Sequence, residues 1–287
     1  MLKKISFVVI LIVVTAFSFV NQVLAYSNQA KHYSFSLPSD WEEIPKSVIE
    51  QYMNEIVKQT NGKRIEYASG FQLAGSEHFK YPYILVQEHK INTPSYSQLE
   101  KVFSDNKFQE TVDRKSSEYS KLLDNATADK PFINKERNII FMNIQHDVAD
   151  LGRVNSLTTM FLGKNDITQL NFYSTENEYS KQLPAFNSII DSFKYDDGYG
   201  YDPVDAKGND SPSVFEGVFE EGISGAIAGG FLMLFIGLIG ILFRKRKKSD
   251  SEVNRNMDAI KYCKECGNEI NASDMTCNKC GKETNKK

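Results

Sequence analysis

The clearest alternation of apolar and polar residues lies in the second half of the chain. Three alternating stretches, 139–148, 154–162 and 167–173, are separated by two turn sequences at 150–152 and 163–166. A period of two places successive side chains on opposite faces of a strand, and Gly together with Asn or Asp favours tight reversals. The pattern therefore predicts an antiparallel meander of three strands.

Shorter patterns surround this meander. Strand patterns occur at 32–38, 65–73 and 81–88, and apolar residues have helical spacing at 48–60, 95–124 and 179–193. The helix at 48–60 follows a capping box, Ser47-Val48-Ile49-Glu50, and Trp41 is expected to fill the core beneath a turn. Because strands and helices do not alternate strictly, the predicted fold class is α+β, an antiparallel sheet with packed helices.

The first 25 residues have the three parts of a secretory signal peptide. Lys3 and Lys4 precede an apolar stretch, and the small residue Ala25 ends the segment. We expect cleavage after Ala25, with an uncleaved signal anchor as the alternative. In both cases the residues that follow are exported.

A second apolar segment, 223–243, contains no charged residue and is followed at once by the basic cluster Arg244–Lys248. At about 1.5 Å per residue, a helix of this length spans a hydrocarbon core of about 30 Å. The basic cluster is expected on the cytoplasmic side. We therefore predict a single-pass protein of the cell membrane, with 26–222 outside and 244–287 in the cytoplasm.

Gly225 and Gly229 form a G-x-x-x-G pattern within this predicted span. Such a row of small residues lets two helices approach closely, so it would suit a homo-oligomer. The simpler explanation is that glycine is common in membrane helices.

The charge distribution agrees with this topology. Residues 26–222 contain 20 Lys and Arg against 30 Asp and Glu, whereas residues 244–287 contain 12 against 7. All four cysteines lie in the second region, which is the reducing side of the membrane in the predicted topology.

These cysteines form two C-x2-C pairs, Cys263 with Cys266 and Cys277 with Cys280, and each pair is followed by a glycine. Each pair supplies one edge of a tetrahedral zinc site, and the glycine permits the tight turn around the sulfurs. Four thiolates leave no coordination position for substrate or water. The sequence thus predicts a structural zinc ion.

Two resemblances to known families follow from these residues. Tyr33–Trp41, the hairpin Thr158–Phe172 and the helical segment Tyr179–Phe193 resemble the PsbP-like α/β/α sandwich over about 31–195. The resemblance implies a fold that is used mostly for binding and assembly, without shared catalytic residues. Residues 261–282 resemble bacterial zinc ribbons in the motif itself.

No catalytic constellation is evident in the exported region. Its four histidines, His32, His78, His89 and His146, have no metal-binding spacing, and the region has neither a thiol nor a G-x-S-x-G motif. We therefore predict that the protein is not an enzyme. A cleft with a histidine hydrogen-bonded to a carboxylate would favour the opposite conclusion.

The acidic, glycine-rich segment 196–222 is interpreted as a linker, because its spacing does not match a calcium loop. The predicted organisation is a signal peptide at 1–25, an exported domain at 26–195, this linker, the span at 223–243, a basic linker at 244–260 and a zinc ribbon at 261–287.

The predicted function is binding on both sides of the membrane. The exported domain would bind a ligand or partner, and the ribbon would dock an unidentified protein. Acidic residues among the lysines of the ribbon argue against a nucleic-acid partner. The rivals are an exported enzyme with the ribbon as an appendage and a structural subunit of an envelope complex.

Overall fold

The computed structural model describes most of the predicted exported domain and parts of the C-terminal region. The described residues are 24–60, 63–91, 94–104, 107–120, 123–148, 151–203, 212–230, 232, 260–262, 269–271 and 276–283.

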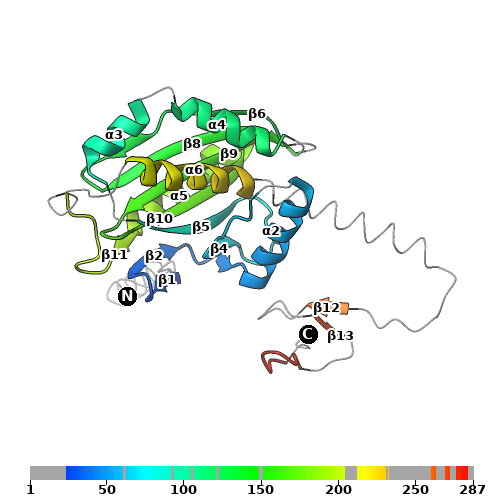
Figure 1. Ribbon diagram of the computed structural model, residues 1–287. Coiled ribbons are helices and arrows are strands. Elements are labelled where there is room, and N and C mark those ends of the chain that lie inside the picture. The colour runs from blue at the N-terminus through cyan, green and yellow to red at the C-terminus, as the bar shows by residue number, and fades with distance from the viewer. Residues whose placement is uncertain are drawn as a thin grey trace, which may run out of the picture.

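The centre of the molecule is an antiparallel sheet of eight strands (Figure 1). Its order is β3 (Trp41–Glu43), β4 (Ser69–Leu73), β5 (Tyr83–Lys90), β10 (Asp166–Thr175), β9 (Gly152–Leu162), β8 (Ile139–Val148) and β6 (Leu123–Ala128), and β7 (Phe132–Asn134) also pairs with β8. Strands β8, β9 and β10 are the meander that the alternation predicts. The mixed class with an antiparallel sheet is thereby confirmed.

One face of this sheet is covered by a small sheet and one helix. The small sheet has the order β1 (Leu24–Asn28), β2 (Tyr33–Leu37) and β11 (Lys194–Tyr195), and the helix is α5 (Glu176–Ser192). Trp41 is buried here, with its ring centroid 6.4 Å from that of Phe186 on α5. Its predicted place in the core is confirmed.

The other face is covered by four helices: α2 (Lys46–Thr60), α3 (Tyr96–Ser104), α4 (Lys107–Glu118) and α6 (Pro212–Gly229). In Figure 1, α3 and α4 lie over one side of this face, α2 lies at the other side, and α6 runs between them. The helix at 48–60 was predicted in type and place. The segment 95–124 was correctly predicted to be rich in helix, but Leu123 and Asp124 at its end belong to strand β6.

Helix α6 corrects the linker prediction. Phe215, Phe219 and Ile223, spaced four residues apart, are buried against the rest of the domain. The acidic neighbours Glu216, Glu220 and Glu221 conceal this apolar stripe in the sequence, because they occupy the positions between its members. Residues 212–222 are therefore part of a packed helix.

The predicted span overlaps this helix. Residues 223–229 belong to α6, whereas 231 and 233–243, the basic cluster and 1–23 lie outside the described residues. Among the residues that the structure describes, no helix combines the length and the apolar character that a membrane crossing needs.

Candidate functional site

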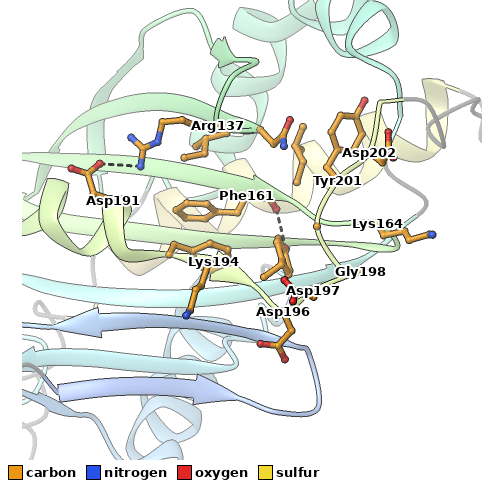
Figure 2. A pocket seen from close by; sticks show the side chains of 16 residues that line it. Arg137, Phe161, Lys164, Asp191, Lys194, Asp196, Asp197, Gly198, Tyr201 and Asp202 are labelled. Atoms are coloured by element: carbon orange, nitrogen blue, oxygen red, sulfur yellow. Dashed lines mark hydrogen bonds and ion pairs between the residues drawn. The ribbon is translucent and has the colours of Figure 1, made fainter.

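An open cleft of about 610 Å³ lies where α5 ends, beside the ends of β8 and β9. Charged side chains of both signs line it: Arg137, Lys164, Lys194, Asp191, Asp196, Asp197 and Asp202. Figure 2 shows Arg137 and Asp191 on one side of the cleft, Phe161 in the middle and the segment with Asp196 and Gly198 on the other side. The cleft therefore offers both cationic and anionic contacts around an aromatic surface.

The aromatic surface is rigidly packed. The rings of Phe161 and Phe193 are stacked with centroids 3.7 Å apart. The Tyr195 hydroxyl accepts a hydrogen bond from the Thr168 N–H at 3.1 Å and lies 3.1 Å from the carbonyl oxygen of Phe161. Burial raises the pKa of Tyr195, so its hydroxyl stays protonated and fixes the ring in place.

Arg137 forms one wall of the cleft and caps the C-terminal end of α5. Its Nη2 donates to the carbonyl oxygen of Ile190 at 3.1 Å and pairs with Asp191 Oδ1 at 2.9 Å. A cation is favourable at this end of a helix, because the last carbonyl groups carry partial negative charge. The same contacts hold the guanidinium at the edge of the cleft.

The opposite wall is the acidic, glycine-rich run that was interpreted as linker. His32 stacks on Tyr199 with centroids 3.6 Å apart, and the His32 carbonyl accepts from the Asp196 N–H at 2.8 Å. The Lys164 N–H donates to the Tyr199 carbonyl at 2.8 Å, and Gly198 has a φ of +85°, which favours glycine. Residues 196–203 thus form an ordered rim of the cleft that is held by hydrogen bonds and ring stacking, and the linker prediction is corrected here too.

The four histidines occupy different parts of the domain. His89 on β5 and His146 on β8 are buried on the face that α6 covers, and His78 follows β4 and is half-buried. Burial lowers the pKa of all three, that of His146 to about 4. They are therefore neutral at neutral pH and are not brought together.

His32 is the histidine beside the cleft. Its Nδ1 lies 3.4 Å from Asp196 Oδ2, and both side chains are substantially exposed, at 38% and 55%. This is the nearest approach to the histidine–carboxylate pair that would favour an enzyme. The contact is long and solvated, and the imidazole is stacked flat on Tyr199.

The structure describes only part of the predicted zinc ribbon. Strands β12 (Ile260–Tyr262) and β13 (Glu269–Asn271) pair antiparallel, whereas Cys263 and Cys266 lie outside the described residues. In the second pair, the Gly281 N–H donates to the Cys277 carbonyl at 2.8 Å, and Gly281 has a φ of +72°. This backbone is the tight turn that the glycine predicts.

The metal site itself stays a prediction, because the residues described include only two of the four cysteines. Within those ranges, no three His, Cys, Asp or Glu side chains lie together as a metal site would need. The turn at Cys277 and Cys280 fits zinc ligation, since it would present two thiolates from one loop.

Gly163 and Gly200 beside the cleft face each other across an isolated β-bridge, and they are expected to differ in their tolerance of a side chain. A Cβ at Gly163 would lie 2.3 Å from Asp166 Oδ1 and 2.9 Å from the Tyr195 ring, whereas one at Gly200 would meet nothing nearer than 4.0 Å. We expect Gly163→Ala to destabilise the domain by about 1–3 kcal/mol and Gly200→Ala to change it little. Thermal unfolding followed by the fluorescence of Trp41, the only tryptophan, measures both. Equal melting temperatures for the two variants would contradict this account of the rim.

The fold and the cleft define an α+β sandwich domain with an open site of mixed charge. The chain belongs to the family described as Protein of unknown function (DUF2167), whose model matches residues 36–250. The matched region includes the predicted span and ends before the ribbon. No curated protein matches the chain.

Several solved structures are similar to the chain, and two of them are described by their similarity to it. One is the solution structure of cyanobacterial PsbP (CyanoP) from Synechocystis sp. PCC 6803, which has 14% sequence identity, a TM-score of 0.40 and an aligned region that covers 62% of this chain and 95% of that one. The other is the crystal structure of the Ran-binding protein Mog1p from Saccharomyces cerevisiae, which has 7% identity, a TM-score of 0.33 and an aligned region that covers 61% of this chain and 95% of that one. The first is a PsbP protein, the group that the sequence resembles. At these TM-scores neither similarity carries an argument about function.

Proposed function

We propose that this is a single-pass membrane protein whose exported domain binds a ligand or protein partner at the cleft, and whose cytoplasmic zinc ribbon docks a second protein. The observation that carries the proposal is the cleft with its fixed rim and mixed charges. The proposed membrane span is supported by the apolar segment 223–243, and the proposed ribbon by the two C-x2-C pairs.

The arrangement of the cleft favours binding over catalysis. Its volume lies within the range of about 300–1,000 Å³ that is typical of ligand sites, and its aromatic floor is prearranged by packing. Cations and anions on facing walls suit a segment that itself carries both charges, because complementary potentials orient a partner. A peptide segment with neighbouring acidic and basic residues is the ligand class that fits best.

The rival is an exported enzyme, and the contact between His32 and Asp196 beside the cleft is an observation in its favour. A catalytic base needs a partner that holds its tautomer and a position within reach of the substrate. His32 is stacked on Tyr199 and does not line the cleft. The geometry therefore supports the binding proposal better.

Photocrosslinking tests the binding site with two matched lysines. Lys194 lines the cleft, whereas Lys181 is an exposed lysine on α5 that lies outside it. A photoreactive amino acid replaces each in turn in the full-length protein in cells. We expect a discrete adduct from position 194 and none from position 181, since only the first lies within reach of a bound partner. Adducts from both positions, or from neither, would contradict a partner at this cleft.

A further inference from the structure

Helix α6 covers a part of the main sheet that is lined with polar side chains, which we call the polar groove. Its floor comprises Gln87 on β5, Gln169 and Asn171 on β10, and Ser156 and Thr158 on β9, each at most 1% exposed. They are bonded to one another: Asn171 Nδ2 donates to Gln87 Oε1 at 3.0 Å, and Thr158 Oγ1 donates to Asn171 Oδ1 at 2.9 Å. Such a lining is unusual beneath a helix rich in glycine, alanine and isoleucine.

The groove holds α6 by the backbone. The hydroxyls of Tyr67 and Tyr83 donate to the carbonyl oxygens of Gly225 and Gly229 at 2.6 Å and 2.5 Å. Gln169 Nε2 donates to the carbonyl oxygen of Gly222 at 3.0 Å. Side-chain donors thus reach the backbone of the helix at Gly222, Gly225 and Gly229.

The fit requires glycine. A Cβ at Gly225 would lie 1.9 Å from Gln87 Oε1, and one at Gly229 would lie 2.1 Å from the Tyr173 hydroxyl oxygen. On the exposed side of the same helix, a Cβ at Gly217 would meet nothing within 4 Å. The groove therefore selects a helix with small residues along one side.

The apolar helix leaves part of the groove unmatched. Gln87 Nε2 is buried and has no hydrogen-bond partner among the described residues. Buried polar groups are ordinarily paired. The docked helix therefore matches the shape of the groove but does not satisfy all of its hydrogen-bonding groups. A site whose polar groups are incompletely satisfied is suited to an occupant that exchanges.

Residues 223–229 of α6 are also the first part of the predicted membrane span. With 223–230 docked, only residues 231–243 of the apolar stretch remain before the basic cluster. At about 1.5 Å per residue, they extend for about 20 Å, short of a hydrocarbon core of about 30 Å. Docking in the groove and a full membrane span therefore exclude each other.

We propose that residues 223–230 exchange between the polar groove and the membrane, and that insertion of the span opens the groove as a binding site for another apolar helix with small residues along one side. This inference rests on the proposed membrane anchoring. The tyrosine hydroxyls and Gln169 would then donate to the backbone of the incoming helix as they donate to α6.

The test uses single cysteines in the full-length protein, in membranes with the exported side accessible. Ser156→Cys lies in the groove floor, and Ser174→Cys is an equally buried control on the face of the sheet that α5 covers. A membrane-impermeant maleimide reaches neither the ribbon cysteines nor a closed groove. We expect it to label Ser156→Cys at least about tenfold faster than Ser174→Cys, because only the groove opens on insertion.

A synthetic peptide of residues 212–230 probes the binding site. It should slow the labelling of Ser156→Cys, whereas the same peptide with Gly229→Ala should not, because its added methyl group would meet Tyr173. Thr158→Cys provides a second groove position if the first variant does not fold.

The two proposals fail in different ways. If the protein remains with carbonate-washed membranes but Ser156→Cys is labelled as slowly as Ser174→Cys, the exchange is wrong and the anchoring stands. If the protein leaves the membranes during the wash, the anchoring is wrong and the exchange with it. Fast labelling that neither peptide slows would overturn the binding site for a second helix.

Discussion

Replacing Cys266 by serine is expected to remove bound zinc from the full-length protein. The wild-type protein should carry one zinc ion per chain, held by Cys263, Cys266, Cys277 and Cys280. Structural zinc in small domains of this kind contributes about 10–16 kcal/mol, because the ligands are not preformed in the unfolded chain. Loss of one thiolate should therefore unfold the ribbon as well as weaken metal binding.

Metal analysis of the purified, reduced protein gives the zinc content directly. Lys279→Ser is the matched control, since Lys279 is exposed and lies between the two cysteines of the second pair without being a predicted ligand. It should retain one zinc ion. A reduced wild-type protein without zinc would disprove the metal site.

The second large effect is expected from the buried His146. Burial lowers the pKa of this imidazole from 6.5 to about 4, and neighbouring Asp147 offsets only part of that effect. Between these two values the unfolded chain binds a proton that the folded domain does not. The domain should therefore lose about 3 kcal/mol of stability from this group as the pH falls from 7 to 4.

Thermal unfolding of the full-length protein in detergent, followed by Trp41 fluorescence at pH 7 and pH 4, measures this loss. In His146→Gln the difference between the two pH values should shrink, because the group that titrates is gone. Gln145→Asn, on the same strand, changes no titrating group and should keep the wild-type difference. An unchanged pH dependence in His146→Gln would contradict the assignment.

The sequence by itself determined the parts of the fold that depend on local pattern. The meander of β8, β9 and β10 is visible because each strand is long and each turn contains its own turn-forming residues. Helix α5 is visible because Phe186, Ile189 and Ile190 recur at helical spacing. Such signals need no knowledge of distant segments.

The shortest strands, β3, β7 and β11, were missed because local pattern does not determine them. Strand β11 has two residues, and it exists because Lys194 and Tyr195 pair with Ser34 and Tyr33 on β2. Pairing across such a separation depends on tertiary contacts, which override local propensity. The cleft was missed with it, because its walls come from segments that only the folded chain brings together.

The prediction of a zinc site rests almost wholly on the sequence, through the spacing of Cys263, Cys266, Cys277 and Cys280. Residues 223–229 are the contrasting case. Their apolar character shows that they avoid water, and it does not distinguish a bilayer from the inside of a protein. Only the tertiary structure placed them on the polar groove, where Gln87 and Tyr173 lie close enough to require the glycines of α6.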